Sequence, residues 1–255
     1  MITGLLLALA QDAAAPDLAW TTGKQPNLSV AYIEYDVGLT LSAVCQSRSF
    51  TLALGGLPPA RADASYRRLE VNLTDDTLRA GDWAVSSDGE RSAALSTAPA
   101  VYARRLLKTP RLTVRVPGDD STPARRYELD LPADPAPLAA VMTECGIPLE
   151  SASDATYDPS ISVITWDRPP QMGVPSPMPS VTSGNALIQC AVDARGRPQN
   201  CVLLDEQPPP LRFRKLCASG GSHGSGSPDR RQPLRAGRDI HHTNDVQRPG
   251  IDHWH

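Results

Sequence analysis

The chain has 255 residues, of which 40% are hydrophobic, 5% aromatic and 21% charged, and its formal net charge is −3 at pH 7. That length suffices for one large domain or two small ones. A charge so close to neutral gives no global field that would attract nucleic acid, so no nucleic-acid partner is expected. The 25 prolines and the few aromatic residues favour β-rich domains with rigid connections.

The first residues read MITGLLLALAQ and contain a short apolar run over residues 5–10. The run ends in Ala8-Leu9-Ala10, and this small-x-small pattern is typical of a secretory cleavage site, so residues 1–10 are predicted to be a signal peptide. The alternative is an alanine-rich start of a cytosolic protein. The run is far shorter than the roughly 18 apolar residues of a membrane helix, and no membrane span is expected. Export would favour disulfide bonds.

Residues 20–150 are predicted to form one β-rich domain, either a sandwich or an open barrel with short helices. Five runs alternate between apolar and polar residues, and Pro or Gly separates them. The apolar positions of these runs are Leu39, Leu41, Ala43 and Cys45; Phe50, Leu52 and Leu54; Leu69, Val71 and Leu73; Leu112, Val114 and Val116; and Tyr127, Leu129 and Leu131. Helices are expected over residues 98–108 and 137–145, the second ending at Gly146.

The next part of the chain divides into a spacer and a hairpin. Residues 151–180 are rich in Pro, which predicts an extended, semi-rigid linker. Residues 181–210 hold two runs with a period of two, and Gly196 between them supplies the positive φ of a tight turn. The apolar or small positions of the two runs are Ala186, Ile188 and Cys190 before the turn, and Cys201 and Leu203 after it.

The cysteines indicate two disulfide bonds. Cys45 and Cys145 flank the β-rich domain, and a turn centred on Arg195-Gly196 would place Cys190 opposite Cys201, within bonding distance. We therefore predict the pairs Cys45–Cys145 and Cys190–Cys201, with Cys217 left over. Four cysteines allow three connectivities, and two reduced core cysteines are the alternative for the hairpin. No CxxC spacing with histidines indicates zinc, and no metal or cofactor is expected.

A family resemblance arises over residues 166–209. The segment reads W-x-R-P-P, then G-N-A-x-I-x-C-x-V-D-x-x-G-R-P, and closes on E-x-P-P. This pattern resembles the start of a TonB C-terminal domain, which consists of a hairpin, a helix and a final strand. The resemblance implies a truncated α+β domain in residues 181–210, a periplasmic location in a Gram-negative bacterium, and a non-enzymatic function. The implied partner is an outer-membrane TonB-dependent receptor, bound by strand addition.

The composition changes after Pro209. Residues 211–255 hold all five histidines and eight Lys or Arg against four Asp, without apolar periodicity, and are predicted to be disordered. The helix and strand that the family places here do not follow. One interpretation is a frameshifted tail, because residues 234–252 read one base later permit a strand-like sequence and a stop. Such a protein would be impaired as an energy transducer, the more so because the family's N-terminal membrane helix is not seen.

Patterns that suggest chemistry are weak throughout. Residues 220–224 match the G-x-S-x-G nucleophile pattern, but their neighbours are polar rather than a strand and a helix. The histidines at 241–242 and at 253 and 255 have no supporting groups for a designed metal site. No catalytic residue is predicted. The alternative function is a secreted enzyme, an inhibitor or a structural envelope protein acting through residues 20–150.

Overall fold

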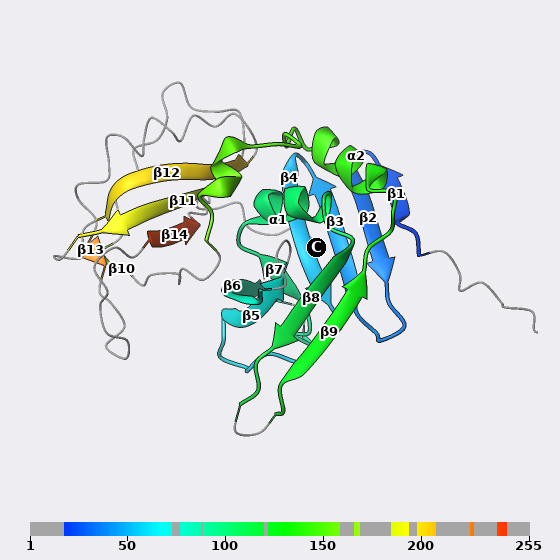
Figure 1. The fold of residues 1–255 in the computed structure, drawn as a ribbon, viewed down its shortest axis with the longest axis horizontal. Coiled ribbons are helices and arrows are strands. Elements are labelled where there is room, and N and C mark those ends of the chain that lie inside the picture. The colour runs from blue at the N-terminus through cyan, green and yellow to red at the C-terminus, as the bar shows by residue number, and fades with distance from the viewer. Residues whose placement is uncertain are drawn as a thin grey trace, which may run out of the picture.

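The protein is described by a computed structural model that covers residues 18–72, 77–87, 89–119, 122–158, 166–168, 185–193, 198–207, 225–226 and 239–243. Nine strands form one antiparallel sheet in the order β1-β2-β3-β4-β7-β6-β5-β8-β9 (Figure 1). These strands are β1 Thr21–Gln25, β2 Leu28–Glu34, β3 Thr40–Gln46, β4 Ser49–Gly55, β5 Tyr66–Asn72, β6 Arg79–Val85, β7 Ala94–Ser96, β8 Arg111–Val116 and β9 Arg125–Asp130. The prediction of a β-rich domain is confirmed.

The sheet is continuous, so it is not a pair of separate sheets. It curves, and the two ends approach each other where the Tyr35 hydroxyl, just after β2, donates to the Asp130 carbonyl of β9 at 3.1 Å. Three partly buried aromatic residues pack on the core near the two edges of the sheet: Trp20 just before β1, Tyr35 just after β2 and Tyr127 on β9. Of the two predicted architectures, this curved single sheet is closer to the open barrel.

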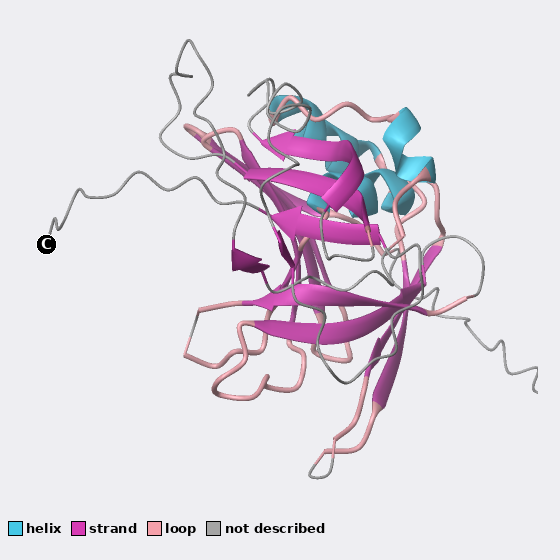
Figure 2. Ribbon diagram, turned by 90° about the vertical axis from the view of Figure 1, so that its left-hand side faces the viewer, coloured by secondary structure: helices cyan, strands magenta, loops and turns pink. Residues whose placement is uncertain are grey.

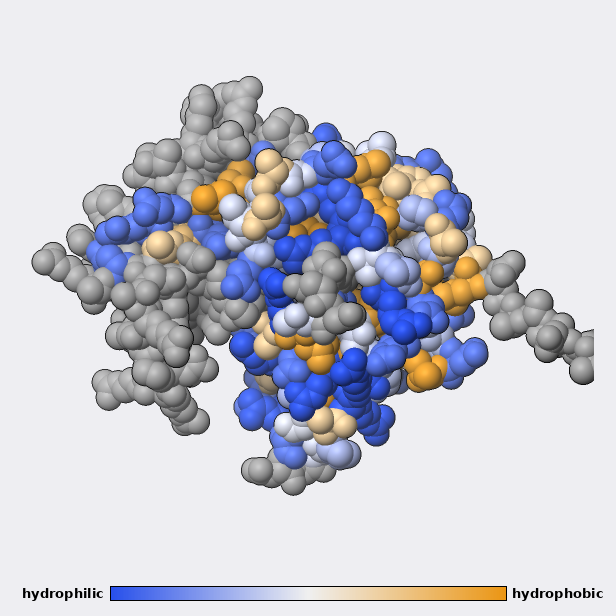
Figure 3. All heavy atoms as spheres, viewed as in Figure 1, coloured by the Kyte–Doolittle hydropathy of each residue, from blue (hydrophilic) through white to orange (hydrophobic). Residues whose placement is uncertain are grey.

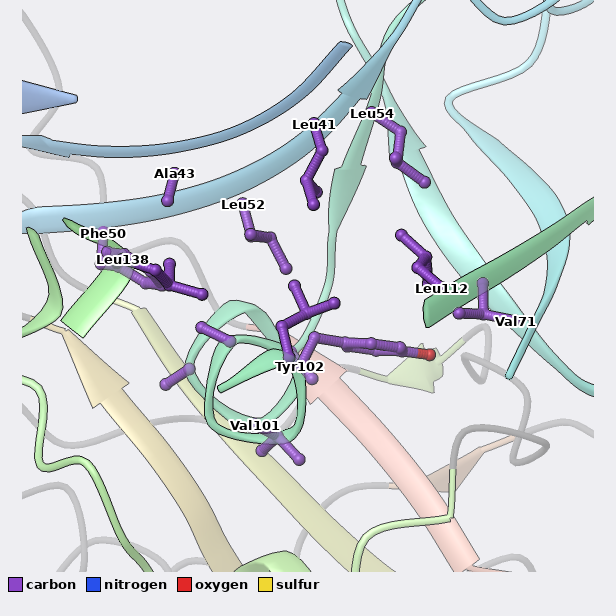
Figure 4. Packing of buried hydrophobic residues seen from close by; sticks show 14 of the residues in the cluster. Leu41, Ala43, Phe50, Leu52, Leu54, Val71, Val101, Tyr102, Leu112 and Leu138 are labelled. Atoms are coloured by element: carbon purple, nitrogen blue, oxygen red, sulfur yellow. The ribbon is translucent and has the colours of Figure 1, made fainter. Parts of the chain in front are cut away.

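The strands form where apolar residues alternate, because a period of two places them all on one face. Leu39, Leu41 and Ala43 are buried, and so are their neighbours Phe50, Leu52 and Leu54 on β4. The pairing Leu41↔Leu54 and Ala43↔Leu52 puts these side chains side by side. Figure 4 shows Leu41 and Leu52 pointing from the sheet toward a helix, and Leu54 pointing toward Leu112. The predicted inward positions within the described residues are therefore confirmed, whereas Leu73 lies outside them.

Two helices cover this face, α1 Pro99–Leu106 and α2 Ala136–Glu144. Pro99 begins α1, where a missing backbone N–H costs nothing, and the Asp134 carboxylate accepts the backbone N–H of Ala136 at 2.9 Å at the start of α2. Gly146, with φ of 76°, ends α2 as predicted. Its N–H bonds the Thr143 carbonyl while Ile147 bonds Met142, which is a Schellman motif. Figure 2 shows the helices gathered at one end of the molecule.

The Cys45–Cys145 disulfide joins β3, the third strand from the β1 edge of the sheet, to the end of α2. Its Cα atoms are 5.5 Å apart, and both cysteines are buried. The predicted pairing is confirmed. Because 100 residues separate the two cysteines, the bond closes a loop that contains most of the domain.

The remaining elements lie after the domain. They are the 3-10 turn η1 Ala152–Ala155 and the strands β10 Trp166–Arg168, β11 Asn185–Val192, β12 Pro198–Gln207, β13 Ser225–Gly226 and β14 Asp239–Thr243. Strands β10 and β13 pair with each other, and β11 lies between β12 and β14 in a second sheet. The predicted signal peptide and most of the tail, with Cys217, fall outside the described residues, where disorder stays a prediction. None of the helices described here is long and apolar enough to span a membrane.

Candidate functional site: the hairpin and its attachment

The hairpin predicted over residues 181–210 is present as β11 and β12. Ile188 pairs with Leu203 and Gln189 with Val202, which is the register that a turn centred on Arg195-Gly196 predicts. The turn itself, residues 194–197, lies outside the described residues. One further step in this register would bring Cys201 opposite Cys190, but the pairing shifts between Gln189 and Ala191. Cys190 is disulfide-bonded, but the side chain of Cys201 is not described, so the Cys190–Cys201 pairing stays a prediction.

The hairpin is attached to the β-rich domain rather than separate from it. Leu187 and Leu204 belong to the same buried cluster as the core of the nine-stranded sheet, and β12 contacts α1. Figure 4 shows Val101 on the side of α1 opposite Leu52, and Val101 is fully buried. The helix is thus covered by the sheet on one side and by further chain on the other.

The turn η1 connects α1 to β12. Arg104 on α1 is only 3% exposed, and its guanidinium binds the Asp154 carboxylate through two bonds of 2.7 and 2.6 Å. Next to Asp154, the Ser153 hydroxyl donates to the Leu204 carbonyl at 3.3 Å. A two-bond arginine–carboxylate pair is strong and directional, so it fixes η1 on the helix. Two adjacent residues of η1 therefore hold it to α1 and to the hairpin.

A cluster of aromatic rings completes this attachment. Trp83 and Tyr102 have ring centroids 5.1 Å apart, and Tyr102 meets the edge of Tyr157 at 5.8 Å. The Arg105 guanidinium lies 5.2 Å from the centroid of Tyr157 and donates to the backbone carbonyls of Asp154 and Tyr157. Such contacts are attractive because a ring has a negative face and a positive edge.

Burial shifts the titration of the two tyrosines. It raises the pKa of Tyr102 from 10.0 to about 12, an effect that hydrogen bonds with Tyr157 and Trp83 and the charge of Arg105 partly oppose. Burial, reinforced by Tyr102, also raises the pKa of Tyr157 well above 10.0. Both hydroxyls are therefore protonated at neutral pH, and neither is a base. The contacts of the cluster fix Tyr157 against α1.

The sequence did not single out these attaching residues because 151–158 read as part of a linker. One signal was present. Ser151 and Asp154 have the S-x-x-D spacing of a helix start, and the Ser151 side chain does accept the Ser153 N–H at 3.4 Å. The domain boundaries at 150 and 181 stay predictions. Tyr157 and Leu204 both lie beyond residue 150, yet they pack on the core of the β-rich domain.

The two sides of β11 differ in regularity. The pairing with β12 shifts register twice, between Leu187 and Ile188 and between Gln189 and Ala191, and Asn200 takes a positive φ of 52°. The pairing with β14 runs without a shift from Leu187↔Thr243 to Ala191↔Asp239. Bulges interrupt the hydrogen-bonding edge of a strand, whereas a regular edge presents an even row of donors and acceptors. The regular side of β11 is thus the one suited to strand pairing.

Gln189 lies at the centre of this regular side. Its side chain is 8% exposed, and its amide oxygen is buried without a hydrogen-bond partner in the described part of the chain. The residue opposite on β12 is Val202, which offers no donor and is 43% exposed. Gln189 therefore presents a buried acceptor that the hairpin itself does not satisfy.

The outer face of the large sheet does not form a comparable site. Its charges are matched by ion pairs at 2.7–3.5 Å: three join neighbouring strands, and one lies within β9. The three are Arg68 to Asp82, Arg115 to Glu70 and Arg111 to Asp130, and the one within β9 is Arg126 to Glu128. Figure 3 shows mainly hydrophilic atoms over β8 and β9. Asp119 accepts the Thr122 N–H in the turn between these strands, the backbone-capping role that its turn context predicts. This face is a solvated, charge-balanced surface.

No group of three or more His, Cys, Asp or Glu residues that could hold a metal ion lies in the described ranges. Residues 220–224 and the histidines 253 and 255 fall outside those ranges. His241 and His242 lie on β14, where they pair with Gln189 and Ile188. A search of protein-family models, of curated proteins and of solved structures finds no match to this chain.

Proposed function

We propose that this protein is a binding module that takes up an extended segment of a partner as an additional strand of the β11–β12 sheet. One observation carries the proposal: a segment remote in sequence, Asp239–Thr243, already lies along β11 in an unbroken antiparallel register. In this mode backbone hydrogen bonds supply affinity and alternate side chains supply specificity.

The strength of such binding follows from the length of the pairing. A five-residue strand makes about five backbone hydrogen bonds, each worth a net of about 1 kcal/mol. Association costs at least about 4 kcal/mol of lost freedom. The backbone alone therefore gives weak, reversible binding, and side-chain contacts must decide which segment is held.

The resemblance over residues 166–209 supplies the identity of the partner within this proposal. It points to a segment of an outer-membrane TonB-dependent receptor and to a location in the periplasm. The Cys45–Cys145 disulfide supports an oxidising compartment such as the periplasm. The protein would act as a soluble binding or adaptor module, and be impaired as an energy transducer.

The experiment is hydrogen exchange on the full chain with a panel of synthetic peptides from the periplasm-facing ends of such receptors. We expect a binding peptide to slow exchange in β11, and the same peptide with N-methyl groups on alternate residues to lose that effect. Two N-methylated peptides are needed, one for each of the two sets of alternate residues. If both still bind, strand addition is refuted. Protection confined to residues 20–150 would instead favour a function of the β-rich domain.

A further inference from the structure

We infer that Gln189 selects the bound segment by requiring a hydrogen-bond donor at the position that faces it. The inference rests on the proposed function and specifies the chemistry of its partner. Three observations support it: the buried amide oxygen without a partner, its place at the centre of the regular side of β11, and the absence of a donor on Val202 opposite.

An unsatisfied buried acceptor favours any occupant that satisfies it. Burial removes water from the amide oxygen without providing a hydrogen-bond donor, which costs free energy. A bound segment that supplies a donor recovers this free energy. Directly opposite residues of antiparallel strands have Cβ atoms about 5 Å apart, so the side chain that faces Gln189 is within reach. On β14 this is position 241.

The neighbouring positions define the rest of the pattern. Side chains two residues apart point to the same face of a sheet, so Leu187 and Ala191 flank Gln189 on one face. Leu187 is buried in the core. A segment that pairs here places the residues two before and two after its donor opposite Ala191 and Leu187, and on β14 these are Asp239 and Thr243. The donor is an amide, a hydroxyl or a cationic N–H, whereas Asp and Glu are excluded because a carboxylate repels another acceptor.

The test uses synthetic copies of residues 236–246, because β14 fixes their register. Three peptides carry His241→Gln, His241→Leu or His241→Glu, and their dissociation constants for the full chain are measured by fluorescence anisotropy. The chain's own segment competes equally with each peptide, so it does not alter the ratios. We expect the Gln peptide to bind about tenfold more tightly than the Leu peptide, and the Glu peptide to bind least.

Variants of the full chain then identify the selecting residue. Gln189→Leu and the closer isostere Gln189→Met should both abolish the preference for Gln over Leu, while Gln199→Leu, the same change at an exposed position of β12, should retain it. Equal affinity of the three peptides for the native chain would overturn the inference and leave strand addition intact. A preference that persists in both Gln189 variants would overturn it as well. Failure of every peptide to bind would refute strand addition, and selection with it.

Discussion

Removing the Cys45–Cys145 disulfide should cost this protein a large part of its stability. A cross-link stabilises mainly by restricting the unfolded chain, and the effect grows with the length of the closed loop. The two cysteines are 100 residues apart. Loop-closure entropy for that length is about 4.7 kcal/mol at 25 °C. Because a small domain is stable by only about 5–15 kcal/mol, the double variant Cys45→Ala/Cys145→Ala should be close to marginal.

Urea denaturation followed by circular dichroism measures this loss. With a slope of about 2 kcal/mol per molar urea, the midpoint should fall by about 2 M. Cys217→Ala, which removes the cysteine that the sequence predicts to be left over, is the matched control and should leave the midpoint unchanged. A midpoint for the double variant within about 0.3 M of the native value would refute the loop-entropy reasoning.

Three further predictions concern the attachment of η1, the tyrosine cluster and a tight turn. Asp154→Ala leaves the buried Arg104 charge unpaired and should lower the free energy of unfolding, measured in urea, by about 3 kcal/mol. Glu150→Ala breaks an ion pair that is exposed at both ends and should lower it by less than about 0.5 kcal/mol. Equal losses for the two variants would contradict the distinction between a buried and an exposed pair. The folded-state pKa of Tyr102, about 12, lies above its ordinary value of 10.0, so its contribution to stability should be complete below pH 10 and be lost as the pH rises toward 12. Urea denaturation at pH 9 and at pH 11 should show this loss. If the loss is just as large in Tyr102→Phe, another group causes it. Gly56 has φ of 74° and its added Cβ would meet the Gly38 carbonyl, so Gly56→Ala should cost about 2 kcal/mol, whereas Gly89→Ala, in open space, should be neutral in thermal denaturation.

The sequence predicted the elements whose pattern was unambiguous. Strands β3, β4 and β8 were foreseen because large aliphatic residues alternate with polar ones along them. Strand β2 was not, because Leu28, Val30 and Tyr32 on one face and Ile33 on the other remove the alternation. Strand β6 carries a single large inward residue, Trp83, and leaves too weak a period to detect. Local sequence patterns therefore predicted those strands whose two faces differ strongly in hydrophobicity.

Long-range partners were harder to foresee, and the candidate site depends on them. The hairpin register at Ile188 and Gln189 could be predicted from the position of the turn, and the Cys45–Cys145 bond from the way the two cysteines flank the domain. The burial of Gln189 could not, since polar residues in a half-buried strand ordinarily face water. Nor could the pairing of Arg104 with Asp154, because the two residues are 50 positions apart and nothing local specifies which acid an arginine meets.

Strand β7 has only three residues, yet it joins the two halves of the large sheet. On one side it pairs with β4 through Ala53↔Leu95 and Leu54↔Ala94, and on the other with β6 through three positions. The strands β1–β4 form by neighbour-to-neighbour hairpins, so they can fold before the rest of the chain is in place. We expect β7 to dock late and to be the line along which the domain parts under load. The disulfide does not span that line, because α2 packs on β2 and β3, on the same side as Cys45. It would keep α2, and with it the chain that leaves β9, fastened to β1–β4 when the sheet parts.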